Sequence, residues 1–276
     1  MDTIVAKITN DSLTDKKIYE QAGQILRAGG LVAFPTETVY GLGADALDEE
    51  ASAKIYAAKG RPSDNPLIVH IADIEALYKL SCEVPDKALK LADKFWPGPL
   101  TMILKKSDIV PDSITGGLGT VAIRMPSHKV AAELIRTSGV YIAAPSANTS
   151  GKPSPTRASH VIKDLSGKID MIIEDDTVDI GVESTIIDLS EEVPTILRPG
   201  YITKEMFEEV IGGVRIDPAI TEGVKSGVVP KAPGMKYRHY APKADLAIVE
   251  GPEEAVVKKI NELAAEAKAH GEQGGI

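Results

Sequence analysis

The chain has 276 residues, 43% of them hydrophobic and 26% charged, and its formal net charge of -9 argues against a general nucleic-acid coat, although a local basic pocket stays possible. A single cysteine, Cys82, rules out a disulfide framework and favours a reducing compartment, and its simplest role is that of a small buried hydrophobe. The sequence has neither a secretory signal pattern nor an apolar run near the ~20 residues of a membrane helix, so we expect a cytoplasmic protein with no membrane partner.

Hydrophobic periodicity predicts that strands and helices alternate along most of the chain. The expected strands cover residues 3–9, 31–34, 67–71, 100–104, 120–125, 140–145, 170–174, 184–189 and 195–199. The expected helices cover residues 15–30, 48–60, 85–95, 128–138, 156–165 and 203–213. Such alternation favours an α/β fold, and the strands that follow one another without a helix favour a mixed sheet over an all-parallel one.

The pattern changes near residue 212. Residues 213–243 are rich in Gly and Pro and have no sustained period, which indicates a linker. Residues 244–270 then predict one strand followed by one amphipathic helix, too little to bury a core alone. We therefore expect a main domain over residues 1–212, a linker over 213–243 and a partial C-terminal domain over 244–276.

Several common motifs of cofactor and metal sites are absent from the sequence. There is no zinc-type Cys or His spacing, no G-x-x-x-x-G-K-[ST] phosphate loop, and no G-x-G-x-x-G after a strand. Ser146 lacks the flanking glycines of a nucleophile elbow, so a hydrolase triad has weak support. Polar residues instead cluster at strand ends and in Gly/Pro loops, where α/β proteins usually build their sites.

Arg124 is the most informative of these polar residues. It shares one face of an otherwise apolar expected strand with Thr120, and arginine is rarely buried without an anionic partner. An ion pair with Asp or Glu and an anionic ligand explain it equally well. For His70, a hydrogen-bonded core imidazole is the simpler interpretation, and for Ser146 and Asn148 it is turn chemistry.

A turn stiffened by one glycine and two prolines holds Lys59 and Arg61. A solvated helix end is the common role of such a pair. A phosphate chain, however, would suit Arg61 as a bidentate donor and Lys59 as a point charge. The residues themselves therefore support an anion-binding cleft in a cytosolic α/β protein.

Taken together and in order, several motifs resemble the L-threonylcarbamoyladenylate synthases, the YrdC-like family. The two signature motifs are K-x-R in KGRPSDNPL and S-x-N in APSANTSGKPSPT, and similar segments are PTETVYGLG, FWPGPLT, VAIRMP, STIID and LRPG. The resemblance covers residues 10–243, and the linker segment APGMKYRHYAP marks the longer, two-domain branch. It implies a twisted mixed sheet with flanking helices around a large concave cleft, followed by a linker and a short C-terminal α/β piece.

The resemblance also implies a reaction, in which L-threonine, bicarbonate and ATP give threonylcarbamoyl-AMP and pyrophosphate. Mg²⁺ would arrive with ATP, no metal-ligating side chains are implied, and the product would pass to a tRNA threonylcarbamoyl transferase. The residues that match the family's threonine site are Thr38, His70, Arg124, Ala144 and Ser184. Those that match its ATP site are Lys59, Arg61, Asn65, Thr120, Ser146, Asn148, Ser154, Arg198 and Tyr240. Lys59 and Arg61 would hold the triphosphate and act as the catalytic cations.

Two other functions compete with this interpretation. One is a double-stranded RNA or tRNA-binding module without adenylation activity, against which the scarcity of aromatics and the lack of a long basic stripe argue. The other is a carbamoyl-transferring enzyme of another pathway. A weak tRNA contact is compatible with the synthase itself. Residues 231–242, KAPGMKYRHYAP, concentrate aromatics and cations, so we expect them to form a flap over the nucleotide.

Overall fold

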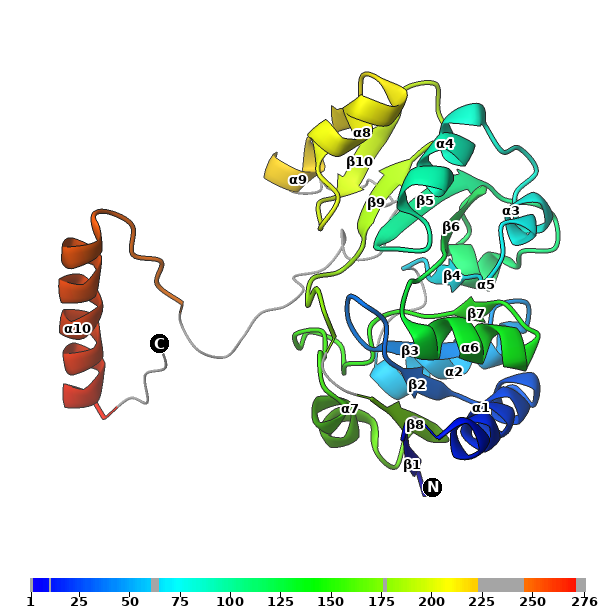
Figure 1. The fold of residues 1–276 in the computed structure, drawn as a ribbon, viewed down its shortest axis with the longest axis horizontal. Coiled ribbons are helices and arrows are strands. Elements are labelled where there is room, and N and C mark those ends of the chain that lie inside the picture. Colours follow the sequence, from blue (N-terminus) through cyan, green and yellow to red (C-terminus); the bar gives the residue numbers. More distant parts are fainter. Residues whose placement is uncertain (1, 10, 61–64, 176–177, 223–245, 272–276) are drawn as a thin grey trace. The chain divides into compact units, whose positions relative to one another are not determined.

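The computed structural model describes residues 2–9, 11–60, 65–175, 178–222 and 246–271 (Figure 1). The chain divides into two compact units, Met1–Ala241 and Pro242–Ile276. Each unit is described by itself below.

One mixed sheet forms the centre of the first unit. In the described residues its eleven strands follow the order β1-β8-β2-β3-β7-β4-β6-β5-β9-β10-β11. They are β1 (Ile4–Lys7), β2 (Val32–Phe34), β3 (Gly41–Asp45), β4 (Ile68–His70), β5 (Leu100–Lys105), β6 (Thr120–Arg124), β7 (Ile142–Ala143), β8 (Met171–Glu174), β9 (Thr185–Asp188), β10 (Thr195–Arg198) and β11 (Arg215–Ile216). Parallel pairs such as β4–β6 and β5–β9 alternate with antiparallel pairs such as β5–β6 and β3–β7, so the expected mixed α/β sheet is confirmed.

The helices connect these strands. They are α1 (Ser12–Arg27), α2 (Glu49–Lys59), α3 (Glu75–Leu80), α4 (Asp86–Phe95), α5 (Asp112–Thr115), α6 (Lys129–Ser138), α7 (Ala158–Leu165), α8 (Lys204–Ile211), α9 (Ala219–Glu222) and, in the second unit, α10 (Glu253–Ala269). The caps fit their ends: the Asp48 side chain accepts from the first-turn amides of α2, and Gly60 ends that helix at φ 61°, in the left-handed region that glycine tolerates.

The two faces of the sheet are covered unequally. Helices α2, α3, α4, α7 and α8 contribute to a large core on one face. On the other face, α1 and α6 pack against each other over the half of the sheet formed by β1, β8, β2, β3 and β7. They bury a second core with β2, β7 and β8 (Figure 1). Over the remaining half lies a small third cluster whose buried members all come from strands, Ile68, Ile103, Ala122, Ile186 and Leu197. Strand surface that the described helices do not cover is therefore available for polar side chains.

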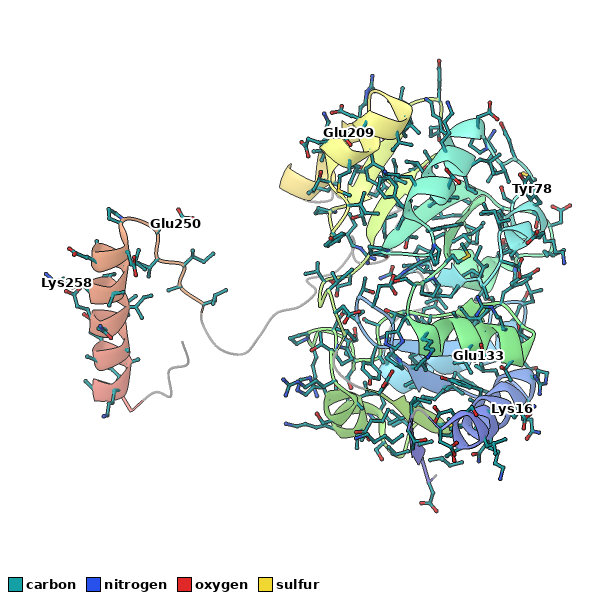
Figure 2. All side chains as sticks on the ribbon, viewed as in Figure 1. Lys16, Tyr78, Glu133, Glu209, Glu250 and Lys258 are labelled. Atoms are coloured by element: carbon teal, nitrogen blue, oxygen red, sulfur yellow. The ribbon has the colours of Figure 1, made fainter. Side chains whose placement is uncertain are left out.

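Long charged side chains lie on the outside of the first unit. Figure 2 shows Lys16 on α1, Glu133 on α6 and Glu209 on α8 pointing away from the sheet. Lys16 makes only an exposed contact of 3.8 Å with Glu20, and such pairs contribute little to stability. The described residues contain no helix that is long and apolar enough to cross a membrane.

Several expectations about the fold were wrong or incomplete. No strand forms in the described residues 246–250, where Leu246 and Ile248 are 84% and 80% exposed, because an extended segment needs a neighbouring strand to pair with. The sheet also continues past residue 212, since β11 pairs with β10. Cys82 is exposed, not buried. The rest of the expected linker, residues 223–243 with the expected flap, lies outside the described residues.

Gly43 provides a test of how β3 is packed. A Cβ atom at this position would lie 2.6 Å from Cγ2 of Ile142 and 2.8 Å from the ring of Phe34. We expect Gly43→Ala to lower the free energy of unfolding by roughly 1–3 kcal/mol, measured by urea denaturation, because both neighbours belong to a packed core. The control is Gly213→Ala, where an added Cβ meets nothing within 4 Å; equal stability of the two variants would contradict the packing.

Candidate functional site

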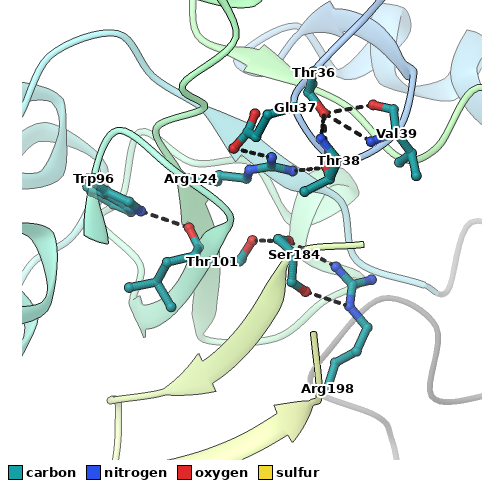
Figure 3. A network of polar contacts seen from close by, with 10 residues as sticks. Thr36, Glu37, Thr38, Val39, Trp96, Thr101, Arg124, Ser184 and Arg198 are labelled. Atoms are coloured by element: carbon teal, nitrogen blue, oxygen red, sulfur yellow. Dashed lines mark hydrogen bonds and ion pairs between the residues drawn. The ribbon is translucent and has the colours of Figure 1, made fainter. Parts of the chain in front are cut away.

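A buried ion pair joins the loop after β2 to strand β6. Nη2 of Arg124 lies 2.7 Å from Oε1 of Glu37, and both side chains are about 5% exposed (Figure 3). The contact joins two opposite charges, and within the described residues Nε of Arg124 has no hydrogen-bond partner. Burial would raise the pKa of Glu37, but the neighbouring Arg124 outweighs it and holds this pKa below its ordinary value.

A chain of hydroxyl groups continues from Arg124. Nη1 of Arg124 donates to Oγ1 of Thr38 at 2.9 Å, and the hydroxyls of Thr38 and Thr36 lie 2.9 Å apart. The Thr36 hydroxyl donates its one proton to the carbonyl of Val39 at 2.7 Å. Thr38 must therefore donate to Thr36, since a hydroxyl has a single proton. Thr38 keeps one lone pair, so toward a ligand it is an acceptor only.

His70 stands beside Arg124 because their strands pair in parallel, with His70 opposite Arg124. Nδ1 of His70 lies 3.1 Å from the carbonyl oxygen of Ile68, which fixes the proton on Nδ1 and leaves Nε2 as an acceptor. Burial first, and then the charge of Arg124, lower the pKa of His70 to about 3. The imidazole is therefore neutral near pH 7.

The next polar group lies where β5 and β9 begin. The hydroxyls of Thr101 and Ser184 are 2.7 Å apart, and Thr101 pairs directly with Arg124 across β5 and β6. Arg198, at the end of β10, donates from Nε to the Ser184 carbonyl and from Nη2 to its hydroxyl, each at 3.0 Å (Figure 3). Five consecutive strands of the sheet, β4-β6-β5-β9-β10, thus hold the site: His70, Arg124, Thr101 and Arg198 lie on β4, β6, β5 and β10, and Ser184 directly precedes β9.

A separate network surrounds the end of α2. Lys59 is 2% exposed, and its Nζ donates to the carbonyls of Ser146 and, at 2.6 Å, of Asn148. The Ser146 hydroxyl donates to Oδ1 of Asn148 at 2.5 Å, and the amide of Ser150 donates to the Lys59 carbonyl at 3.0 Å. The expected turn interpretation of Ser146 and Asn148 is correct in part, but the same loop also holds a buried ammonium group.

The remaining expected site residues do not belong to the two networks described above. Asn65 is fully buried, its carbonyl accepts from Tyr56 at 2.9 Å, and its side-chain amide has no hydrogen-bond partner among the residues that the structure describes. The buried hydroxyl of Ser154 also has none. Thr120 begins β6, four residues from Arg124, and Ala144 is 3% exposed just after β7. Arg61 and Tyr240 lie outside the described residues.

Three residues of the site were not assigned from the sequence: Thr36, Glu37 and Thr101. A signal for an anionic partner was present, because a buried Arg124 requires an anion, but it did not identify Glu37. Of the two explanations left open for Arg124, the carboxylate pair is present, and within the described residues Nε of the guanidinium still has no partner.

Comparisons with known proteins agree with this arrangement. A family model described as "Telomere recombination", covering Sua5, YciO and YrdC, matches residues 24–200, and one described as "Threonylcarbamoyl-AMP synthase, C-terminal domain" matches residues 202–276. The chain belongs to the threonylcarbamoyl-AMP synthase family. This confirms the resemblance read from the motifs, and with it membership of a family of enzymes.

Individual relatives support the same assignment. A threonylcarbamoyl-AMP synthase of Pyrococcus abyssi is 56% identical over 99% of this chain and 79% of its own length. One of Bacillus subtilis is 53% identical over 92% of this chain and 73% of its own. The crystal structure of P. abyssi Sua5 complexed with L-threonine is 52% identical, with a TM-score of 0.90, over 100% of this chain and 81% of that one.

The neutral state of His70 predicts how stability depends on pH. The pKa of His70 is lower in the folded than in the unfolded chain, so its contribution is complete above about pH 6.5 and is lost as the pH falls toward 3. We expect His70→Gln to reduce the fall in unfolding free energy between pH 7 and pH 4 by on the order of 2 kcal/mol, measured by denaturation at each pH. His160→Gln, which removes an exposed imidazole, is the control, and parallel curves for all three proteins would contradict the prediction.

Proposed function

We propose that this protein forms threonylcarbamoyl-AMP and pyrophosphate from L-threonine, bicarbonate and ATP. The observation that carries the proposal is the state of Arg124: within the described residues it is a buried guanidinium whose Nε has no hydrogen-bond partner and whose Nη2 contacts only Glu37, in a chain whose relative at 52% identity was crystallised with L-threonine. Buried N–H groups without partners are costly, and a carboxylate would satisfy them as a bidentate acceptor.

The other polar groups fit the amino acid around this anchor. Ser184 and the neutral His70 would meet the hydroxyl or amino group of L-threonine, and Ala144 would contribute only its backbone. Thr38, restricted to accepting, would accept a hydrogen bond from the ligand. The small cluster of Ile68, Ile103, Ala122, Ile186 and Leu197 supplies an apolar surface on the same face of the sheet.

The proposed ATP site rests on cationic side chains. We propose that Lys59, with Arg61 beside it in sequence, binds the phosphates, and that Arg198, Asn65, Thr120, Ser146, Asn148, Ser154 and Tyr240 complete the nucleotide site. An oxygen of threonine carbamate would attack the α-phosphate and pyrophosphate would leave, so the protein supplies position and charge without a nucleophile of its own.

Mg²⁺ is part of the proposal and would be bound through the phosphates, whose negative charge it neutralises. This mode of binding needs no dedicated cage of carboxylates. It is compatible with the part of the chain that the structure describes, in which no three His, Cys, Asp or Glu side chains come together as a metal site.

The proposal extends to the fate of the product and the location of the protein in the cell. The product is a mixed anhydride of a carbamate and a phosphate, which a tRNA threonylcarbamoyl transferase would consume. We propose a cytoplasmic location and at most a weak contact with tRNA. Neither enters the reaction itself.

Release of pyrophosphate tests the proposed function directly. The protein should release pyrophosphate from ATP and Mg²⁺ only when both L-threonine and bicarbonate are present, measured by a coupled phosphate assay. Mass spectrometry of the same mixture should show threonylcarbamoyl-AMP. Tight binding of double-stranded RNA without any pyrophosphate release would favour the RNA-binding alternative and refute the proposal.

Arg124 tests the assignment of the two substrates. Removing one partner of a buried carboxylate pair costs roughly 2–5 kcal/mol, so Arg124→Ala should lose most L-threonine binding and little ATP binding in calorimetric titrations. The matched control is Arg136→Ala, which removes an exposed arginine that lies 3.8 Å from Glu133. Equal losses for both substrates in Arg124→Ala would show that the arginine does not select the amino acid.

A further inference from the structure

Glu37 has no role in the function proposed so far, although its burial makes it one of the most costly residues of the site. It is 4% exposed, and within the described residues its carboxylate has no side-chain partner other than Arg124. An ion pair with Arg124 compensates its charge in part, but a buried carboxylate normally also accepts several hydrogen bonds. The carboxylate therefore has unused capacity to accept hydrogen bonds from a donor.

The hydrogen-bond acceptors and donors around the Arg124–Glu37 ion pair lie side by side. On the acceptor side are the Glu37 carboxylate and the remaining lone pair of Thr38, whose own proton is committed to Thr36. On the donor side are Nε and Nη2 of Arg124, and Nη1 of the same guanidinium contacts Thr38 at 2.9 Å. A ligand with an N–H donor group and a carboxylate would thus find partners for both groups close together: acceptors on Glu37 and Thr38, and donors on Arg124.

Charge balance specifies the ligand further. Arg124 and Glu37 together have no net charge, so a simple carboxylate would bring a second negative charge next to Glu37. A zwitterion brings a positive and a negative group at once and leaves the pocket neutral. An α-amino acid has both groups on one carbon atom, which suits two partners whose charged atoms are 2.7 Å apart.

We propose that Glu37 binds the α-ammonium group of the amino-acid substrate and thereby selects zwitterions over carboxylates that lack this group. This inference rests on the proposed function, since it names a second recognition residue in the same amino-acid pocket. Glu37 acts as a fixed negative charge, because the neighbouring guanidinium holds its pKa below the ordinary range and it is a poor proton acceptor. The proton lost when the ammonium group and bicarbonate give the carbamate and water is therefore released to water, not to Glu37.

Calorimetric titration with two ligands tests the inference. L-Threonine and (R)-3-hydroxybutyrate share the carboxylate, the hydroxyl and the carbon chain, and only L-threonine has the ammonium group. Wild-type protein should bind L-threonine more tightly by roughly 30-fold or more. In Glu37→Gln, L-threonine binding should weaken by a similar factor while 3-hydroxybutyrate binding stays equal or improves, so that the discrimination between them collapses.

The matched control is Glu83→Gln, which also breaks an ion pair of 2.7 Å, with Lys105, but on the exposed surface; it should leave both affinities unchanged. If Glu37 only positioned Arg124, Glu37→Gln would weaken both ligands equally, which would overturn the inference, as would unchanged L-threonine binding. Should Glu37→Gln fail to fold, Glu37→Asp should show a smaller loss for L-threonine alone. Wild-type protein that does not bind L-threonine would overturn the proposed function itself.

Discussion

The buried contact between Arg124 and Glu37 is the constraint on which the site depends. Two full charges are held where each side chain is about 5% exposed, and burial of charge is tolerated only when partners are placed accurately. Strand β6 is central in the sheet, so the position of Arg124 is set by its neighbours β4 and β5. Backbone pairing of β6 with β4 and β5 therefore fixes the position of Arg124.

The loop that carries Glu37 fixes the position of the other partner. It follows β2 and is buried although it has no regular structure, so its polar groups need partners. The amides of Ile180 and Gly181 donate to the carbonyls of Glu37 and Thr38 at 2.9 and 3.1 Å. Those two residues lie shortly before Ser184, so one loop holds the backbone of the Glu37 segment and continues directly to Ser184 at the start of β9.

Sequence reasoning predicted the faces of strands better than their partners. Period-two alternation correctly placed Arg124 and Thr120 on one face of β6, away from Val121 and Ile123 of the large core, because side-chain direction is a local property. The partner of Arg124 is 87 residues away in sequence, so no local pattern identifies Glu37. Strand β3 was missed for a related reason: its glycine-rich sequence has little strand propensity and is held extended by pairing with β2 and β7.

The two sets of site residues meet at Ser184. Its hydroxyl accepts from Arg198, which matches the family's ATP site, and lies 2.7 Å from Thr101, which pairs across the sheet with Arg124 of the threonine set. Hydrogen bonds thus link Arg198 to Ser184 and Ser184 to Thr101, and Thr101 is the direct strand neighbour of Arg124. A reaction between a carbamate and an α-phosphate needs its two substrates to be adjacent, and the shared serine brings their binding groups together without a separate connecting element.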